Sequence, residues 1–100
     1  MIRFKQPRHV QEWHRKLKDG QAKAMIAMRP HRLASGHSGD AAPVGGRVSE
    51  LRIQYGPGYR VYYQQRGDPI ILLLCGGDDT QGRDIRTAER IAGQWSDDDG

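Results

Sequence analysis

The segment SELRIQYGPGYRVYY, residues 49–63, decides the fold class, because it reads as two short strands joined by a tight turn. Alternation groups the apolar side chains on one side of both strands, namely Leu51, Ile53, Tyr55, Tyr59, Val61 and Tyr63. For these two sets to share a face, we expect Tyr55 to pair with Tyr59 across a three-residue loop, Gly56-Pro57-Gly58. A two-residue loop would turn one strand over and bury its arginine.

The other side of this hairpin carries two arginines and a tyrosine. In the expected register Arg52 lies opposite Tyr62, and Arg60 lies diagonally from Arg52 at roughly 7 to 8 Å between backbones. Arginine offers a rigid fork that matches phosphate, and tyrosine can stack on a base, so the combination suits RNA. The alternative is a solvated sheet face on which Arg52 pairs with Glu50 or Asp40. The alternation pattern leaves both interpretations open.

The segments around the hairpin predict helices on both sides of it. Apolar residues at helical spacing indicate a first helix that ends at Asp19-Gly20 and a second over residues 21–35, which together form a helical hairpin. Pro30 lies inside the second helix and predicts a kink or break near residues 26–29. A C-terminal helix is expected to begin near Thr80, a residue that can serve as its N-cap.

The remaining segments complete the prediction of an α+β fold. Residues 35–46 are rich in glycine and polar residues and are expected to form a loop, whereas the apolar run 70–75 is typical of a strand covered on both faces. We therefore expect an N-terminal helical hairpin packed on an antiparallel sheet of three to four strands, followed by a C-terminal helix. The length suits one domain, residues 1–95, and the acidic residues 96–100 are expected to be a disordered tail.

Charge is distributed unevenly along the 100 residues. Residues 1–66 carry 13 Lys and Arg against four Asp and Glu, a net charge of +9, whereas residues 67–100 carry three against eight, or −5. The first part suggests a positive surface facing phosphate, although a solvated surface is the alternative. The longest apolar run has six residues, far below the ~20 needed to cross a bilayer, which predicts a cytoplasmic protein with no membrane contact. Cys75 is the sole cysteine, so the chain can form no internal disulfide.

Residues 36–85, GHSGDAAPVGGRVSELRIQYGPGYRVYYQQRGDPIILLLCGGDDTQGRDI, resemble the addiction-module killer proteins of the RelE/HigB group, which are toxins of type II toxin-antitoxin systems. With the N-terminal helices, the resemblance covers about residues 2–94. It implies a RelE-like, microbial-ribonuclease-like fold. It also implies a ribosome-dependent mRNA endoribonuclease, or mRNA interferase, that uses no metal or other cofactor. The implied partners are mRNA on the ribosome and a cognate antitoxin, expected to be of the helix-turn-helix type.

The resemblance also assigns candidate catalytic residues. Arg60 matches the toxin arginine that contacts the scissile phosphate, and Arg52 matches a basic position on the preceding strand. Asp78 matches the end of the last strand, which borders the cleft, and Arg83 is a further candidate in the segment after it.

His9 and His14 are five residues apart on a helix, which does not place two ligands on one face, so we expect no zinc site there.

The candidate RNA-binding residues are Tyr62, Arg47 and His37. His37 could also act as a proton acceptor, since histidine titrates near neutral pH. Two departures bear on activity: Ala42 and Asp79 stand where relatives commonly have lysine. The chain could therefore be a weakened toxin that binds RNA or antitoxin without cleavage. A third possibility is an interaction subunit whose basic face docks an acidic partner.

Overall fold

The computed structural model describes residues 4–36, 39–67 and 69–95. His37 and residues 96–100, to which the sequence assigns an RNA-binding role and a disordered tail, lie outside these ranges. Helices and strands follow in the order β1 (Phe4–Lys5), α1 (Arg8–Lys16), α2 (Gly20–Ala34), β2 (Ala41–Gly45), β3 (Val48–Ile53), β4 (Tyr59–Gln65), β5 (Ile70–Gly77), the short 3-10 helix η1 (Asp78–Thr80) and α3 (Gln81–Gln94). The predicted α+β class is confirmed, with two N-terminal helices, an antiparallel sheet and a C-terminal helix.

The sheet has the strand order β1-β5-β4-β3-β2. Strands β2 to β5 pair antiparallel, and the two-residue β1 adds a parallel fifth strand beside β5. The prediction that residues 35–46 are all loop is wrong for β2. The segment AAPVG looks like a loop because of its proline and glycine, but an edge strand tolerates Pro43, since one side of its backbone needs no partner.

The β3–β4 hairpin differs from the predicted register by two residues. Ile53 pairs with Tyr59, which places Arg52 directly opposite Arg60, and the expected pairing of Tyr55 with Tyr59 is wrong. The connection therefore has five residues, 54–58, instead of three. A shift of two residues keeps every side chain on its predicted face, so the division into an apolar and an arginine-bearing side still holds.

Contacts with α2 explain the longer connection. The hydroxyl group of Tyr55 lies 3.3 Å from Oδ1 of Asp19 and 3.4 Å from Oε1 of Gln21, so this side chain leaves the ladder and reaches the start of α2. The turn is closed by the backbone N–H of Gly58, which donates to the carbonyl oxygen of Tyr55 at 3.0 Å. Gly58 has a φ of 88°, a left-handed conformation that glycine adopts without strain.

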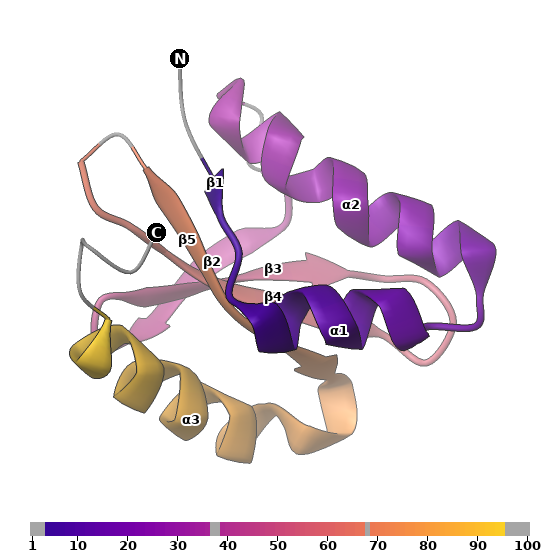
Figure 1. The fold of residues 1–100 in the computed structure, drawn as a ribbon. Coiled ribbons are helices and arrows are strands. Elements are labelled where there is room, and N and C mark those ends of the chain that lie inside the picture. The colour runs from indigo at the N-terminus through magenta and orange to yellow at the C-terminus, as the bar shows by residue number, and fades with distance from the viewer. Residues whose placement is uncertain (1–3, 37–38, 68, 96–100) are drawn as a thin grey trace.

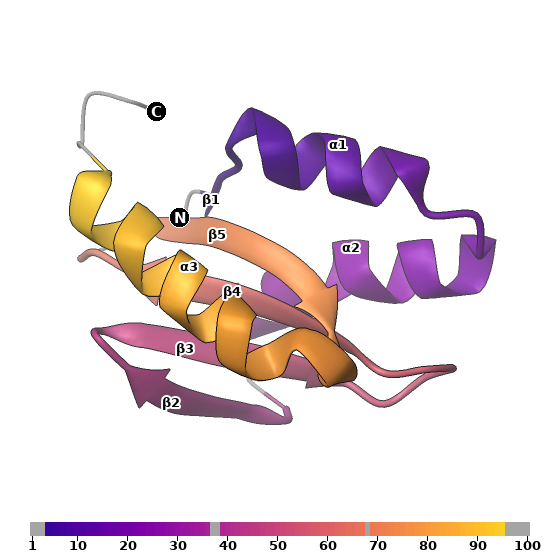
Figure 2. The ribbon, with the colours of Figure 1, turned by 90° about the horizontal axis from the view of Figure 1, so that it is seen from below.

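Helices cover both faces of the sheet. Figures 1 and 2 show α1 and α2 on one face and α3 on the other. The core beneath α1 and α2 consists of Val10, Ile26, Leu51, Ile53, Val61, Tyr63, Ile70, Leu72 and Cys75. The core beneath α3 consists of Val48, Tyr62, Ile71, Leu73, Ala88 and Ala92. Strand β5 contributes to both cores, which confirms the prediction that it is covered on both faces.

Helix α2 runs through Pro30 from Gly20 to Ala34, so a break near residues 26–29 is wrong. Pro30 is buried and borders a small cavity shared with Val61 and Leu72 of the sheet. Burial of its ring against the sheet offsets the backbone hydrogen bond that proline cannot donate. None of the helices in the described ranges combines the length and the apolar character needed to cross a membrane.

Candidate functional site

Arg60 lies at the start of β4, and two carboxylates bind its guanidinium group. Nη1 donates to Oε1 of Glu50 at 2.8 Å, and Nε donates to Oδ1 of Asp78 at 2.7 Å. The Arg60 side chain is 15% exposed. Burial alone would lower the pKa of Arg60, but the hydrogen bonds to Asp78 and Glu50 outweigh burial and raise it. Arg60 therefore stays charged and is fixed in orientation.

Glu50 is the central residue that the sequence did not assign to the site. Its side chain is 2% exposed, and besides Arg60 it is bonded by Nε2 of Gln81, which lies 3.3 Å from Oε1 and 3.1 Å from Oε2. Alternation along β3 did place Glu50 on the same side as Arg52. Alternation alone could not show that Glu50 is held in the site, because the amide that binds it belongs to Gln81 of α3, 31 residues further along the chain.

Arg52 belongs to the same cluster. Its Nη2 lies 3.0 Å from Oδ1 of Asp40, and its Nε lies 3.9 Å from Oε1 of Glu50. These are the ion pairs of the solvated-face interpretation that alternation left open. Two guanidinium groups thus face the three carboxylates of Asp40, Glu50 and Asp78, and the cluster carries no excess of positive charge.

A groove of about 500 Å³ opens beside this cluster. It is lined by Arg52, Ile53, Gln54, Tyr55, Gly56, Pro57, Gly58, Arg60 and Asp78. The fold therefore brings three of the candidate catalytic residues, Arg52, Arg60 and Asp78, to one groove under the β3–β4 loop. An arginine held by a buried carboxylate at the edge of such a groove can present a fixed charge to an anionic ligand.

Tyr62 does not face this groove. Its side chain is 0% exposed and packs in the core beneath α3, so it cannot stack on an RNA base. The predicted RNA-binding role of Tyr62 is wrong, because α3 covers the part of the arginine-bearing face where Tyr62 lies. Burial, followed by the nearby carboxylates of Glu50 and Asp84, raises the pKa of Tyr62 to about 12. Among the described residues, its hydroxyl group has no hydrogen-bond partner.

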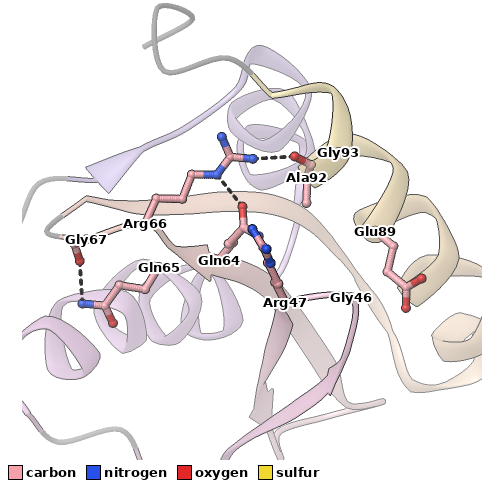
Figure 3. A pocket seen from close by; sticks show the side chains of 9 residues that line it. All are labelled: Gly46, Arg47, Gln64, Gln65, Arg66, Gly67, Glu89, Ala92 and Gly93. Atoms are coloured by element: carbon pink, nitrogen blue, oxygen red, sulfur yellow. Dashed lines mark hydrogen bonds between the residues drawn. The ribbon is translucent and has the colours of Figure 1, made fainter.

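Two further candidates lie away from the groove. Arg83 projects from α3 with a 71% exposed side chain, and its Nε lies 3.5 Å from Oδ1 of Asp84. Arg47 precedes β3, at the end of the strand opposite to Arg52, and lines a separate cavity of about 840 Å³ (Figure 3). In that cavity Arg66 donates to Oε1 of Gln64 and to the carbonyl oxygen of Ala92, which ties β4 to the end of α3. The structure thus does not unite Arg47 and Arg83 with Arg60.

The fold and the groove define a small α+β protein with an Arg-Glu pair fixed between the neighbouring strands β3 and β4 of the sheet. The chain belongs to the same family as a Haemophilus influenzae protein (strain ATCC 51907 / DSM 11121 / KW20 / Rd), described as an uncharacterized protein. The two are 42% identical over 92 residues, which cover 91% of this chain and 93% of the relative. No family model and no solved structure matches the chain.

Proposed function

We propose that this chain is the toxin of a type II toxin-antitoxin module, with a RelE-like fold and a metal-independent mRNA endoribonuclease activity on the ribosome. A cognate antitoxin neutralises it. The observation that carries the proposal is the fixed Arg60 at the groove, with Arg52 directly opposite on β3. The resemblance of residues 36–85 to RelE/HigB toxins supports the same activity.

In the proposed reaction the RNA 2′-oxygen attacks the adjacent phosphorus. A bond forms between the 2′-oxygen and phosphorus, the bond from phosphorus to the 5′-oxygen breaks, and one proton moves from the 2′-hydroxyl to the leaving 5′-oxygen. Arg60 and Arg52 offset the charge that develops on the phosphoryl oxygens. Removing one well-placed donor from such a site typically costs about 10² to 10³ in rate.

The proton acceptor in this scheme is Asp78. Its side chain is 54% exposed and borders the groove, whereas Glu50 is 2% exposed and closed to substrate. Asp78 accepts the proton of the 2′-hydroxyl and then returns it to the 5′-oxygen. Glu50 is a positioning residue, because it acts by holding the guanidinium group of Arg60.

The second candidate function is RNA or antitoxin binding without cleavage. The balance of charges favours it, since three carboxylates face two arginines. Ala42 also pairs with Glu50 across β2 and β3, so the lysine common in relatives would lie beside this cluster. Its ammonium group is missing here.

Expression of the chain alone in bacteria separates the two functions. The toxin proposal predicts growth arrest and new mRNA 5′ ends on ribosomes. Arg60→Lys keeps a cation for Glu50 but loses the fork geometry, so cleavage should fall by at least about tenfold. Arg90→Lys, at an exposed position of α3, is the matched control and should cleave like the wild type. Normal growth with intact mRNA in cells that contain folded wild-type chain would favour binding without cleavage.

A further inference from the structure

The two carboxylates on Arg60 differ in how freely they can move. Glu50 is buried, and both Arg60 and Gln81 hold it. Asp78 is 54% exposed and lies in the three-residue η1. Rotation of the Asp78 side chain would carry its carboxylate into solvent, whereas Glu50 has no such route. Arg60 therefore has one fixed partner and one exchangeable partner.

The hairpin loop is shaped around the Asp78 carboxylate. A Cβ atom at position 58 would collide with the carboxylate group of Asp78, and glycine at this position leaves the space open. The carboxylate thus occupies a recess between the loop and Arg60, inside the groove. The Asp78 carboxylate accepts from Arg60 through one oxygen atom, Oδ1, and a phosphate oxygen can accept the same charge-assisted hydrogen bond from Nε.

We propose that Asp78 is an internal competitor for phosphate at Arg60, and that an RNA phosphodiester binds by displacing its carboxylate. The inference rests on the proposed function for the identity of the ligand. Displacement replaces one charge-assisted hydrogen bond at Nε with another, while Glu50 keeps the guanidinium group in place. Asp78 then acts as a specificity-determining residue, because an anion must bind Arg60 better than a carboxylate does to enter the recess.

The test compares Asp78→Asn with Asp79→Asn. Both variants remove one negative charge from η1, but of these two aspartates Asp78 is the one whose carboxylate binds Arg60. Inorganic phosphate is titrated while the NMR signal of the Arg60 Nε–H group is followed. A single-stranded RNA with 2′-O-methyl groups, which cannot be cleaved, serves as the second probe. We expect Asp78→Asn to bind both probes about tenfold more tightly, since it removes a competing charged partner.

The matched control should gain less than about threefold, through long-range electrostatics alone. With cleavable RNA on ribosomes, Asp78→Asn should lower KM and also kcat, a split that a merely structural residue would not produce. Asp78→Ala, which offers Arg60 no amide, should give the same gain in phosphate affinity, and thermal unfolding checks that each variant is folded.

Equal affinities of the Asp78 and Asp79 variants would overturn the inference. The inference would also be overturned if phosphate shifted the Arg60 Nε–H signal in none of the proteins. If the wild type leaves ribosome-bound mRNA intact but Asp78→Asn still gains phosphate affinity, the ribonuclease proposal fails and the displacement of Asp78 stands.

Discussion

Replacing Arg60 with alanine should destabilise the fold as well as the site, because it leaves the Glu50 carboxylate buried without its cation. Glu50 is 2% exposed, and Nη1 of Arg60 is 2.8 Å from its Oε1. Removing one partner of a buried ion pair costs about 3 to 5 kcal/mol. Arg60 is 15% exposed and Gln81 still donates to Glu50, so we expect about 2 to 3 kcal/mol here. For a domain of this size, that lowers Tm by roughly 10 to 20 °C.

The assay is urea and thermal unfolding of the wild type, Arg60→Ala, Glu50→Gln and the double variant. The double variant should be at least about 1 kcal/mol more stable than the sum of the single effects predicts, since the neutral amide needs no cation. Arg90→Ala removes an exposed arginine from α3 and should stay within about 0.5 kcal/mol of the wild type.

Additive single effects, or an Arg60→Ala protein as stable as the wild type, would refute this reasoning. Glu50 would then be satisfied without Arg60. If the prediction holds, lost toxicity in Arg60→Ala is ambiguous, because a less stable protein is also less abundant. Arg60→Lys is therefore the better test of catalysis.

Three further predictions concern neighbouring positions. The pKa of Tyr62 rises from 10.0 to about 12 on folding, so the stability given by its neutral phenol is complete below pH 10 and lost as pH approaches 12. Tyr62→Phe should remove that part of the alkaline loss in urea unfolding, and an unchanged pH profile would contradict it. Gly58→Ala should cost about 1 to 2 kcal/mol more than Gly56→Ala in thermal unfolding, because both have positive φ but only the Cβ at position 58 meets Asp78. Ala42→Lys should strengthen RNA binding and steepen its salt dependence by roughly one unit of slope, and an unchanged slope would show that the lysine contacts no phosphate.

Much of the candidate groove could be predicted from the sequence. Alternation places Arg52 and Arg60 on one side of the hairpin, and the resemblance adds Asp78 at the end of the last strand. The charge state of the groove could not be predicted. Asp78 lies 18 residues after Arg60, whose guanidinium group it binds. Gln81, whose amide holds Glu50, lies 31 residues after Glu50. Ion pairs and hydrogen bonds of this kind depend on how helices and strands pack against one another. The periodicity of apolar residues carries no information about this packing.

The sequence by itself determined the α+β class, the two helical segments before the hairpin, the buried β5, and the side of β3 and β4 that packs beneath α1 and α2. It could do so because the spacing of apolar residues directly reflects which side of a helix or strand is buried. Tertiary structure alone decided that β2 joins the sheet, that the hairpin loop has five residues, and that α3 covers Tyr62. Each of these depends on contacts between distant segments, since backbone pairing and helix docking select among local conformations that the sequence leaves nearly equal in free energy.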